Sequence, residues 1–241
     1  GLGVIRMTCG NCDCPFHEIQ AEHSPFSSGD FQCLVTEAVK QVRFAAGDVV
    51  FAEGETSESL YSLTSGLVKI TCHTPDGREQ IVGLSSPGKL LAGLQSLNDD
   101  HYCYSAVAET PVMACKIKHR ALLHAISHRG DVALRVVAAL NAQLAHSRKL
   151  MCVMGHKNAA AKIAAFISLI IPKSERGNRR FTLPFSRADI ANLLGLSEET
   201  VCRQMAKMKR NGILSAPRGK IEILDWDQLQ AVADEVCLEV A

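Results

Sequence analysis

The sequence predicts an α+β fold in which an antiparallel β-roll of jelly-roll type comes first, a long helix second and a winged helix-turn-helix last. Short runs of β-forming residues separated by glycines extend from about residue 44 to residue 117, as is typical of sandwiches and rolls. Residues 131–154 repeat apolar side chains at near-heptad spacing. Residues 186–212 have the pattern of two short helices joined by a glycine-containing turn.

Composition narrows the functional classes. The chain has 241 residues, of which 47% are hydrophobic and 21% are charged, so it is large enough for one or two domains and is not mainly disordered. It has no apolar run of about 18 residues, the length that a membrane-spanning helix needs. Its start, GLGVIRM, lacks the layout of a signal peptide. We therefore expect a cytoplasmic protein with no membrane partner.

Positive charge is concentrated around the predicted helix-turn-helix. The net charge of the whole chain is only +1, but Arg176 to Lys220 contains ten Lys or Arg against three Asp or Glu. Ile221 to Ala241 contains six acidic residues and no Lys or Arg. A basic region that coincides with such a motif is typical of nucleic-acid binding.

The two helices of the motif have recognisable starts and an inner face. Ser186, followed by Asp189, gives the first helix a capping-box start. Apolar residues at helical spacing form its inner face: Ile190, Leu193 and Leu194. Gly195 ends this helix, and Ser197 caps the second one.

The second helix is predicted to have an apolar face of Val201, Met205 and Met208. The opposite face carries Glu199, Cys202, Arg203, Ala206 and Arg210. An arginine can bridge guanine O6 and N7, and a carboxylate can accept from cytosine N4. Glu199 and Arg203 are therefore candidates to read one G·C pair in a DNA major groove. The alternative is a small helical core whose outer charges are merely solvated.

Further candidate DNA contacts surround this face. Lys207, Lys209 and Arg210 at the helix end suit phosphates, as does Arg218 at the tip of a β-hairpin wing predicted from 213–214 and 221–224. Ser197, at the start of the second helix, is the last of the candidate DNA-contacting residues.

The remaining predicted elements are a hairpin at Pro75-Asp76-Gly77, a helix over 158–171, a loop over 172–178, a strand over 179–185 and a final helix over 225–240.

The predicted long helix has an apolar stripe that favours a partner. It consists of Leu134, Val137, Leu140, Leu144 and Met151. The stripe could pack within its own chain, but a helix-turn-helix usually binds two half-sites as a dimer. We therefore expect a homodimer.

Ten cysteines are more than packing requires. Cys9, Cys12 and Cys14 form a C-x2-C-x-C-P run without helical or strand periodicity, and such thiolates can converge on an iron–sulfur centre or on zinc. A thiol-rich terminus without a metal is the alternative. We expect four other cysteines to pack as small hydrophobic residues, namely Cys33, Cys72, Cys152 and Cys237, and His73 and His101 to lie at the surface.

The order of β-roll, long helix and winged helix-turn-helix resembles the CRP/FNR superfamily of bacterial transcription regulators. Lys157-Asn158-Ala159, the run from Ala164 to Ile167 and the run from Ser186 to Leu196 are especially similar to the FNR branch. The branch's Glu-x-x-Ser-Arg pattern corresponds here to Glu199 through Arg203, which implies reading of the central G·C pair of a TTGA-like half-site. Cys202 replaces the serine, and a thiol is a weaker hydrogen-bond donor.

The resemblance also bears on the signal that is sensed. The cyclic-AMP branch needs a Gly-Glu-Leu step and an Arg-Ser or Arg-Thr pair, where this chain has Ala92-Gly93-Leu94 and Tyr102-Cys103. The FNR branch implies an oxygen-labile 4Fe–4S cluster held by Cys9, Cys12, Cys14 and Cys115, with Cys33 and Cys103 in reserve. The family spacing is commonly C-x2-C-x5-C, whereas this chain has the narrower C-x2-C-x-C. A 2Fe–2S cluster and zinc therefore remain open as alternatives to 4Fe–4S.

The resemblance implies a DNA-binding transcription regulator that senses oxygen or redox state. Its expected partners are double-stranded DNA, a second copy and RNA polymerase. The expected boundaries are 1–20 for the cysteine-rich segment, 21–129 for a cyclic-nucleotide-binding-like β-roll, 130–156 for the dimerisation helix and 157–241 for the winged domain. The alternatives are a regulator of this fold that responds to thiol oxidation, zinc, haem or an organic effector, a binding module without a sensor, and a cupin-like enzyme. No convergent metal set or nucleophile–base pair is visible, so we expect no catalysis.

Overall fold

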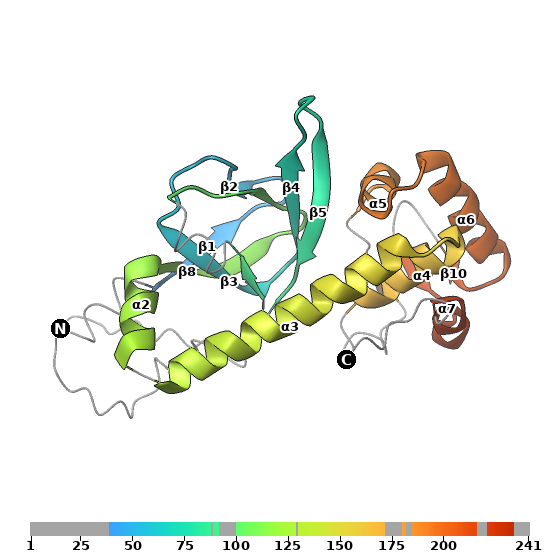
Figure 1. Ribbon diagram of the computed structural model, residues 1–241. Helices are drawn as coiled ribbons and strands as arrows, with labels where there is room; N and C mark the ends of the chain where they lie inside the picture. The colour runs from blue at the N-terminus through green and yellow to red at the C-terminus, as the bar shows by residue number, and fades with distance from the viewer. Residues whose placement is uncertain are drawn as a thin grey trace. The chain divides into compact units, whose positions relative to one another are not determined.

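The structure is a computed structural model that describes residues 39–87, 89–91, 100–128, 130–171, 180–181, 185–215 and 221–233 (Figure 1). The described residues group into two compact units. One contains those up to Cys72 and from Leu84 to Gln143, and the other contains His73–Gly83 and those from Leu144 onward. No helix in these ranges is long and apolar enough to cross a membrane. The predicted α+β class is confirmed.

Two four-stranded sheets form the β-roll within the described ranges. The first has the order β1-β8-β3-β6 and the second the order β2-β7-β4-β5. Their bounds are Val39–Phe44 (β1), Val49–Phe51 (β2), Ser59–Ser65 (β3), Val68–His73 (β4), Glu79–Ser85 (β5), Leu90–Leu91 (β6), Ser105–Ala108 (β7) and Val112–Lys118 (β8). The pairings of β3, β7 and β8 are antiparallel. The first strand begins at Val39, earlier than the sequence pattern predicts.

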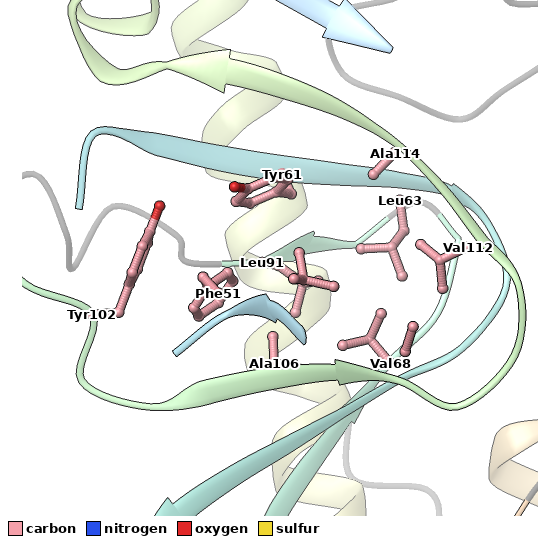
Figure 2. Packing of buried hydrophobic residues seen from close by; sticks show 11 residues of the cluster. Phe51, Tyr61, Leu63, Val68, Leu91, Tyr102, Ala106, Val112 and Ala114 are labelled. Carbon is pink, nitrogen blue, oxygen red and sulfur yellow. The ribbon is translucent and has the colours of Figure 1, made fainter. Parts of the chain in front are cut away.

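The interior of the roll is filled by apolar side chains from both sheets, as Figure 2 shows. The ring of Phe51 stacks on Tyr102 at a centroid distance of 4.1 Å and on Tyr61 at 5.7 Å. Aromatic pairs of this kind contribute beyond their buried area. The buried hydroxyl of Tyr102 donates to the carbonyl oxygen of Ser59 at 2.8 Å, so its polar atom has a partner in the core.

One turn of the roll depends on glycine. Gly66, between β3 and β4, has φ +85°, a backbone region that side-chain-bearing residues rarely adopt. A Cβ at this position would also collide with the carbonyl oxygen of Pro111 and lie 2.9 Å from Cα of Val112. The close approach of two backbone segments therefore excludes a side chain here.

Two helices follow β8. These are α2 (His119–His128) and α3 (Gly130–Gly155). The sequence predicts helical periodicity directly after Cys115, but β8 continues to Lys118 because it pairs with both β1 and β3. A second buried cluster joins these elements and consists of Leu60, Leu90, Cys115, Ile117, Leu122, Ala125 and Val136.

The second unit contains the C-terminal helices and a small sheet. The helices are α4 (Ala159–Ile170), α5 (Arg187–Leu194), α6 (Glu198–Arg210) and α7 (Trp226–Ala233), and the sheet has the order β10-β11-β9. Its strands are β9 (Arg180–Phe181), β10 (Leu214–Ser215) and β11 (Ile221–Ile223). The nearly all-buried helix α4 packs against α5, α6 and α7. The predicted strand over 179–185 is shorter, since Phe185 lies outside any strand and packs edge-on against Phe166. Residues 172–178 and 234–240 lie outside the described ranges.

Candidate nucleic-acid interface

Helix α5 begins with the capping box that its sequence predicts. The Oγ of Ser186 accepts from the backbone N–H of Asp189 at 3.0 Å, and Oδ2 of Asp189 accepts from the N–H of Ser186 at 3.0 Å. Two otherwise unpaired donors are thereby satisfied. The helix ends at Gly195, whose φ of 63° is left-handed. The capping box therefore fixes the start of α5, and Gly195 ends the helix before the turn to α6.

Helix α6 is capped and polarised as the second helix of the motif. Ser197 accepts from the N–H of Thr200 at 3.2 Å. The first turn holds two glutamates and the last turn three basic residues, an arrangement that complements the helix dipole. Val201, Met205 and Met208 are buried, so the predicted inner face is confirmed.

The outer face of α6 brings together most of the predicted DNA contacts. Nη1 of Arg203 lies 3.7 Å from Oε1 of Glu199, and the two side chains are 62% and 87% exposed. Cys202 is half-buried, whereas Ser197, Lys207, Lys209 and Arg210 are exposed. An exposed pair of this kind adds little stability, so both groups are available to a ligand. Arg218 lies outside the described residues.

Sequence reasoning missed a lysine that links this motif to α4. Lys162 is only 8% exposed, and its Nζ donates to the carbonyl oxygen of Leu194 at 3.0 Å. Leu194 is the last residue of α5, where carbonyl groups lack helical partners and a cation is favourable. A single lysine within the apolar run AAAKIAAFISLI is the signal that could have identified it.

The predicted cysteine ligands fall partly within the structure. Cys115 lies on β8 opposite Gln41 and Ser62, is 8% exposed and belongs to the buried cluster that includes Leu122 and Val136. Cys9, Cys12 and Cys14 lie outside the described residues, as do Cys33 and Cys237. Within the described part of the chain, no group of three or more His, Cys, Asp or Glu residues could hold a metal ion.

The other predicted surface and packing residues can be placed. His73 and His101 are exposed, whereas Cys72 and Cys152 are half-buried. Cys103, at the position where the cyclic-AMP branch has serine or threonine, is exposed, and the neighbouring Tyr102 is buried in the core.

Helix α3 exposes most of the predicted apolar stripe. The exposed fractions are 72% for Leu134, 53% for Val137, 48% for Leu144 and 61% for Met151. Leu140 differs, because it packs against the buried cluster around Cys115. Four large apolar side chains on one helix thus contact mainly solvent in the single chain, which is uncommon for an isolated protein surface.

Comparisons with known proteins agree with this geometry. The family model described as "Cyclic nucleotide-binding domain" matches residues 41–129, and "Crp-like helix-turn-helix domain" matches residues 161–232. The chain is 30% identical to the transcriptional activatory protein AadR of Rhodopseudomonas palustris, over 96% of this chain and 98% of that protein. It is 32% identical to the nitrogen fixation regulation protein FixK of Bradyrhizobium diazoefficiens, over 80% and 82%.

Solved structures show the same architecture. FixK2 from Bradyrhizobium japonicum superposes with a TM-score of 0.68 at 25% identity, covering 80% of this chain and 96% of that one. A CRP-family regulator from Thermus thermophilus gives a TM-score of 0.70 at 25% identity, covering 83% and 100%. The fold and the helix-turn-helix define a DNA-binding transcription regulator rather than an enzyme. The chain belongs to the CRP/FNR family.

Proposed function

We propose that this regulator is cytoplasmic, acts as a homodimer on TTGA-like palindromic half-sites and senses oxygen or redox state through an iron–sulfur cluster bound by cysteines. The observation that carries its DNA-reading part is the exposed Glu199–Arg203 pair on α6. One arginine fork and one carboxylate, a helical turn apart, match the guanine and cytosine edges of a single base pair. The basic residues at the end of α6 supply phosphate contacts.

The exposed stripe on α3 supports the homodimer. Val137, Leu144 and Met151 repeat every seven residues, the spacing at which two helices pack side by side. Pairing through this stripe would bury apolar side chains that solvent now contacts, and each one contributes about 1.5–3 kcal/mol when fully buried. A paired helix also gives two copies of α6, as a palindromic site requires. RNA polymerase is the proposed protein partner at the promoter.

The described residues supply one donor that fits an iron–sulfur cluster. Cys115 is a buried thiol in apolar surroundings, where a cluster would be shielded from water. Cys9, Cys12 and Cys14 are the proposed remaining ligands. A bound 4Fe–4S or 2Fe–2S cluster supplies oxygen-sensitive redox chemistry. The role of Cys115 is to anchor the N-terminal cysteines to β8, beside the cluster of side chains that supports α3.

The alternative is a regulator of this fold without iron, which responds to thiol oxidation, zinc, haem or an organic effector. The narrow C-x2-C-x-C spacing favours it. A cyclic nucleotide is a poorer candidate, because Tyr102 replaces the expected arginine and its ring stacks on Phe51 inside the roll.

The test is to measure iron, acid-labile sulfide and zinc in full-length protein purified without oxygen, with visible spectra before and after exposure to air. We expect iron and sulfide in near-stoichiometric amounts and an absorption band that decays in air. Cys115→Ser should lose most of the iron, whereas Cys152→Ser should retain it. Colourless, iron-free protein that still binds its DNA site as a dimer would overturn the cluster and leave the regulator. The zinc content and thiol titration would then separate the remaining signals.

A further inference from the structure

Two cysteines that are distant in sequence lie side by side on the second sheet of the β-roll. Strands β4 and β7 are antiparallel, with Thr71 opposite Ser105. Cys72 is the next residue of β4, and Cys103 lies two residues before the start of β7. The Sγ of Cys72 lies 3.9 Å from the carbonyl oxygen of Cys103. A sulfur this close to the backbone of the other cysteine places the two side chains near enough for a disulfide to be tested.

Hydrogen bonds hold the backbone beside Cys103 in place. The N–H of Tyr102 donates to the carbonyl oxygen of Glu55 at 2.9 Å, and the carbonyl oxygen of Tyr102 accepts from the N–H of Gly54 at 2.8 Å. On the other side, Oγ of Ser105 accepts from the N–H of Glu53 at 2.9 Å. Because both flanks are fixed, the two cysteines stay close without rearrangement of the sheet.

The two thiols differ in accessibility. Cys103 is exposed, so a small solute reaches it directly. Cys72 is half-buried, and burial, the carboxylate of Glu53 and the sulfur of Cys103 raise the pKa of its thiol. An incoming oxidant therefore meets Cys103 first, and Cys72 is positioned as the second thiol.

We propose that Cys72 and Cys103 form a two-thiol oxidation site that closes to a disulfide when a hydroperoxide reacts with it. The Cys103 thiolate attacks one oxygen of hydrogen peroxide, the O–O bond breaks, and hydroxide leaves and is protonated to water. The sulfur of Cys72 loses its proton and attacks the resulting sulfenic sulfur. The S–S bond forms as the S–O bond breaks, and a second water is released. Overall, two thiols are oxidised to a disulfide and one peroxide is reduced to two waters.

This site goes beyond the proposed function, since neither cysteine is one of the four proposed cluster ligands Cys9, Cys12, Cys14 and Cys115, and Cys103 is named only as a reserve ligand. Closure would tie β4 to the segment that enters β7, within the roll that matches the family's sensor domain. The two properties can therefore be tested separately on the same protein.

The experiment treats the full-length chain with a small excess of hydrogen peroxide, blocks remaining thiols with N-ethylmaleimide and digests with trypsin plus a glutamate-specific protease. Cleavage after Lys69 and Arg78 isolates Cys72, and cleavage after Lys89 and Glu109 separates Cys103 from Cys115. Mass spectrometry should show these two peptides linked, with the loss of two hydrogens and full reversal by dithiothreitol.

Matched variants decide the assignment. The linked peptide should disappear in Cys72→Ser, where Cys103 should instead accumulate as sulfinic acid, and it should persist in Cys152→Ser. Iron content, measured in parallel, should be the same in Cys72→Ser as in the parent chain. The disulfide test therefore gives a clear result even if the protein binds no iron–sulfur cluster. Three results in the peroxide-treated parent protein would overturn the proposal. Cys103 could carry N-ethylmaleimide, be over-oxidised, or be joined to a cysteine other than Cys72.

Discussion

The Nζ of Lys162 donates to the carbonyl oxygen of Leu194 at 3.0 Å and so joins α4 to the last residue of α5. The lysine is almost fully buried, and its charge lies where the unpaired carbonyl groups of α5 are directed. The contact fixes the first helix of the helix-turn-helix against the helix that supports the whole winged unit. Its geometry therefore determines how α6 is presented.

Replacing this lysine should destabilise the winged unit. Lys162→Met keeps the apolar stem but leaves the Leu194 carbonyl without its donor, which should lower the free energy of unfolding by about 1–3 kcal/mol. Trp226, the only tryptophan of the chain, lies in α7, so its fluorescence during urea unfolding reports on this unit. Lys157→Met, at an exposed position, is the control and should change the free energy of unfolding by less than about 0.5 kcal/mol.

Removing the arginine of the α6 pair should weaken specific binding. Arg203→Ala should cost about 1–3 kcal/mol of binding free energy at a TTGA-containing duplex and much less on scrambled DNA. Lys209→Ala should weaken binding to both duplexes alike and reduce the salt dependence, as expected for a phosphate contact. Fluorescence anisotropy titrations at several salt concentrations measure both. Equal losses on the two duplexes for Arg203→Ala would assign that residue to phosphate.

A charge in the α3 stripe should separate the proposed dimer. Leu144→Glu introduces a carboxylate that pairing would have to bury next to its own copy, and burying such a charge is costly. Sedimentation analysis should show a shift from dimer to monomer, with loss of binding to a palindromic site. Ala142→Glu adds the same charge at an exposed position of α3 that is turned about 160° away from Leu144, and it should remain dimeric. An unchanged mass for Leu144→Glu would assign the dimer contact elsewhere.

Two glycines with the same backbone conformation should respond differently to alanine. Gly66 and Gly77 have φ of +85° and +80°, but only the Gly66 Cβ position meets other backbone atoms. Alanine at Gly77 should cost about 1–2 kcal/mol for the left-handed conformation. Alanine at Gly66 should cost about 1–3 kcal/mol more, because two backbone segments must separate. Thermal unfolding followed by circular dichroism compares the two variants.

The buried histidine at the start of α2 should make stability depend on pH. Burial lowers the pKa of His119, and a backbone hydrogen bond with Ser57 opposes this shift only in part. Well above about pH 6.5, the ordinary histidine pKa, the imidazole is neutral in both states. As pH falls below that value, the unfolded chain binds a proton before the folded chain does, so unfolding becomes easier.

The measurement is thermal unfolding of the parent chain and His119→Gln between about pH 7.5 and 5.5, a range that spans the ordinary histidine pKa. The stability advantage of the parent chain should shrink as pH falls. His124→Gln changes an exposed histidine of the same helix and serves as the control. A parent-minus-His119→Gln difference that is constant across this range would contradict the prediction.

Local signals explain which features the sequence predicts well. The capping box of Ser186 and Asp189 and the buried face of α6 depend on residues within one or two helical turns, so spacing alone identifies them. The start of β1 at Val39 was missed because its residues are largely exposed or half-buried and give a weak apolar pattern. The strand is formed by hydrogen-bonded pairing of β1 with β8, which is far away in the sequence.

Contacts between segments that are distant in the chain could not be predicted from sequence patterns. The proximity of Cys72 to Cys103 depends on β4 pairing with β7, and the Lys162–Leu194 bond depends on how α4 packs on α5. Neither follows from periodicity. Leu140 illustrates the same limit, because heptad spacing places it in the stripe whereas packing places it against the inner cluster. The ligand set that includes Cys9 stays a prediction.

The position of Cys115 has a mechanical consequence. It shares a buried cluster with Val136, and the next residue of α3, Val137, is turned by about 100° and is 53% exposed. In the proposed sensor, the side chain that packs in the Cys115 cluster and a side chain that faces the proposed dimer partner are therefore adjacent residues of one helix. If Cys115 binds the proposed cluster, a change in volume there would act on packing that includes Val136, without an intermediate element before the exposed stripe of α3.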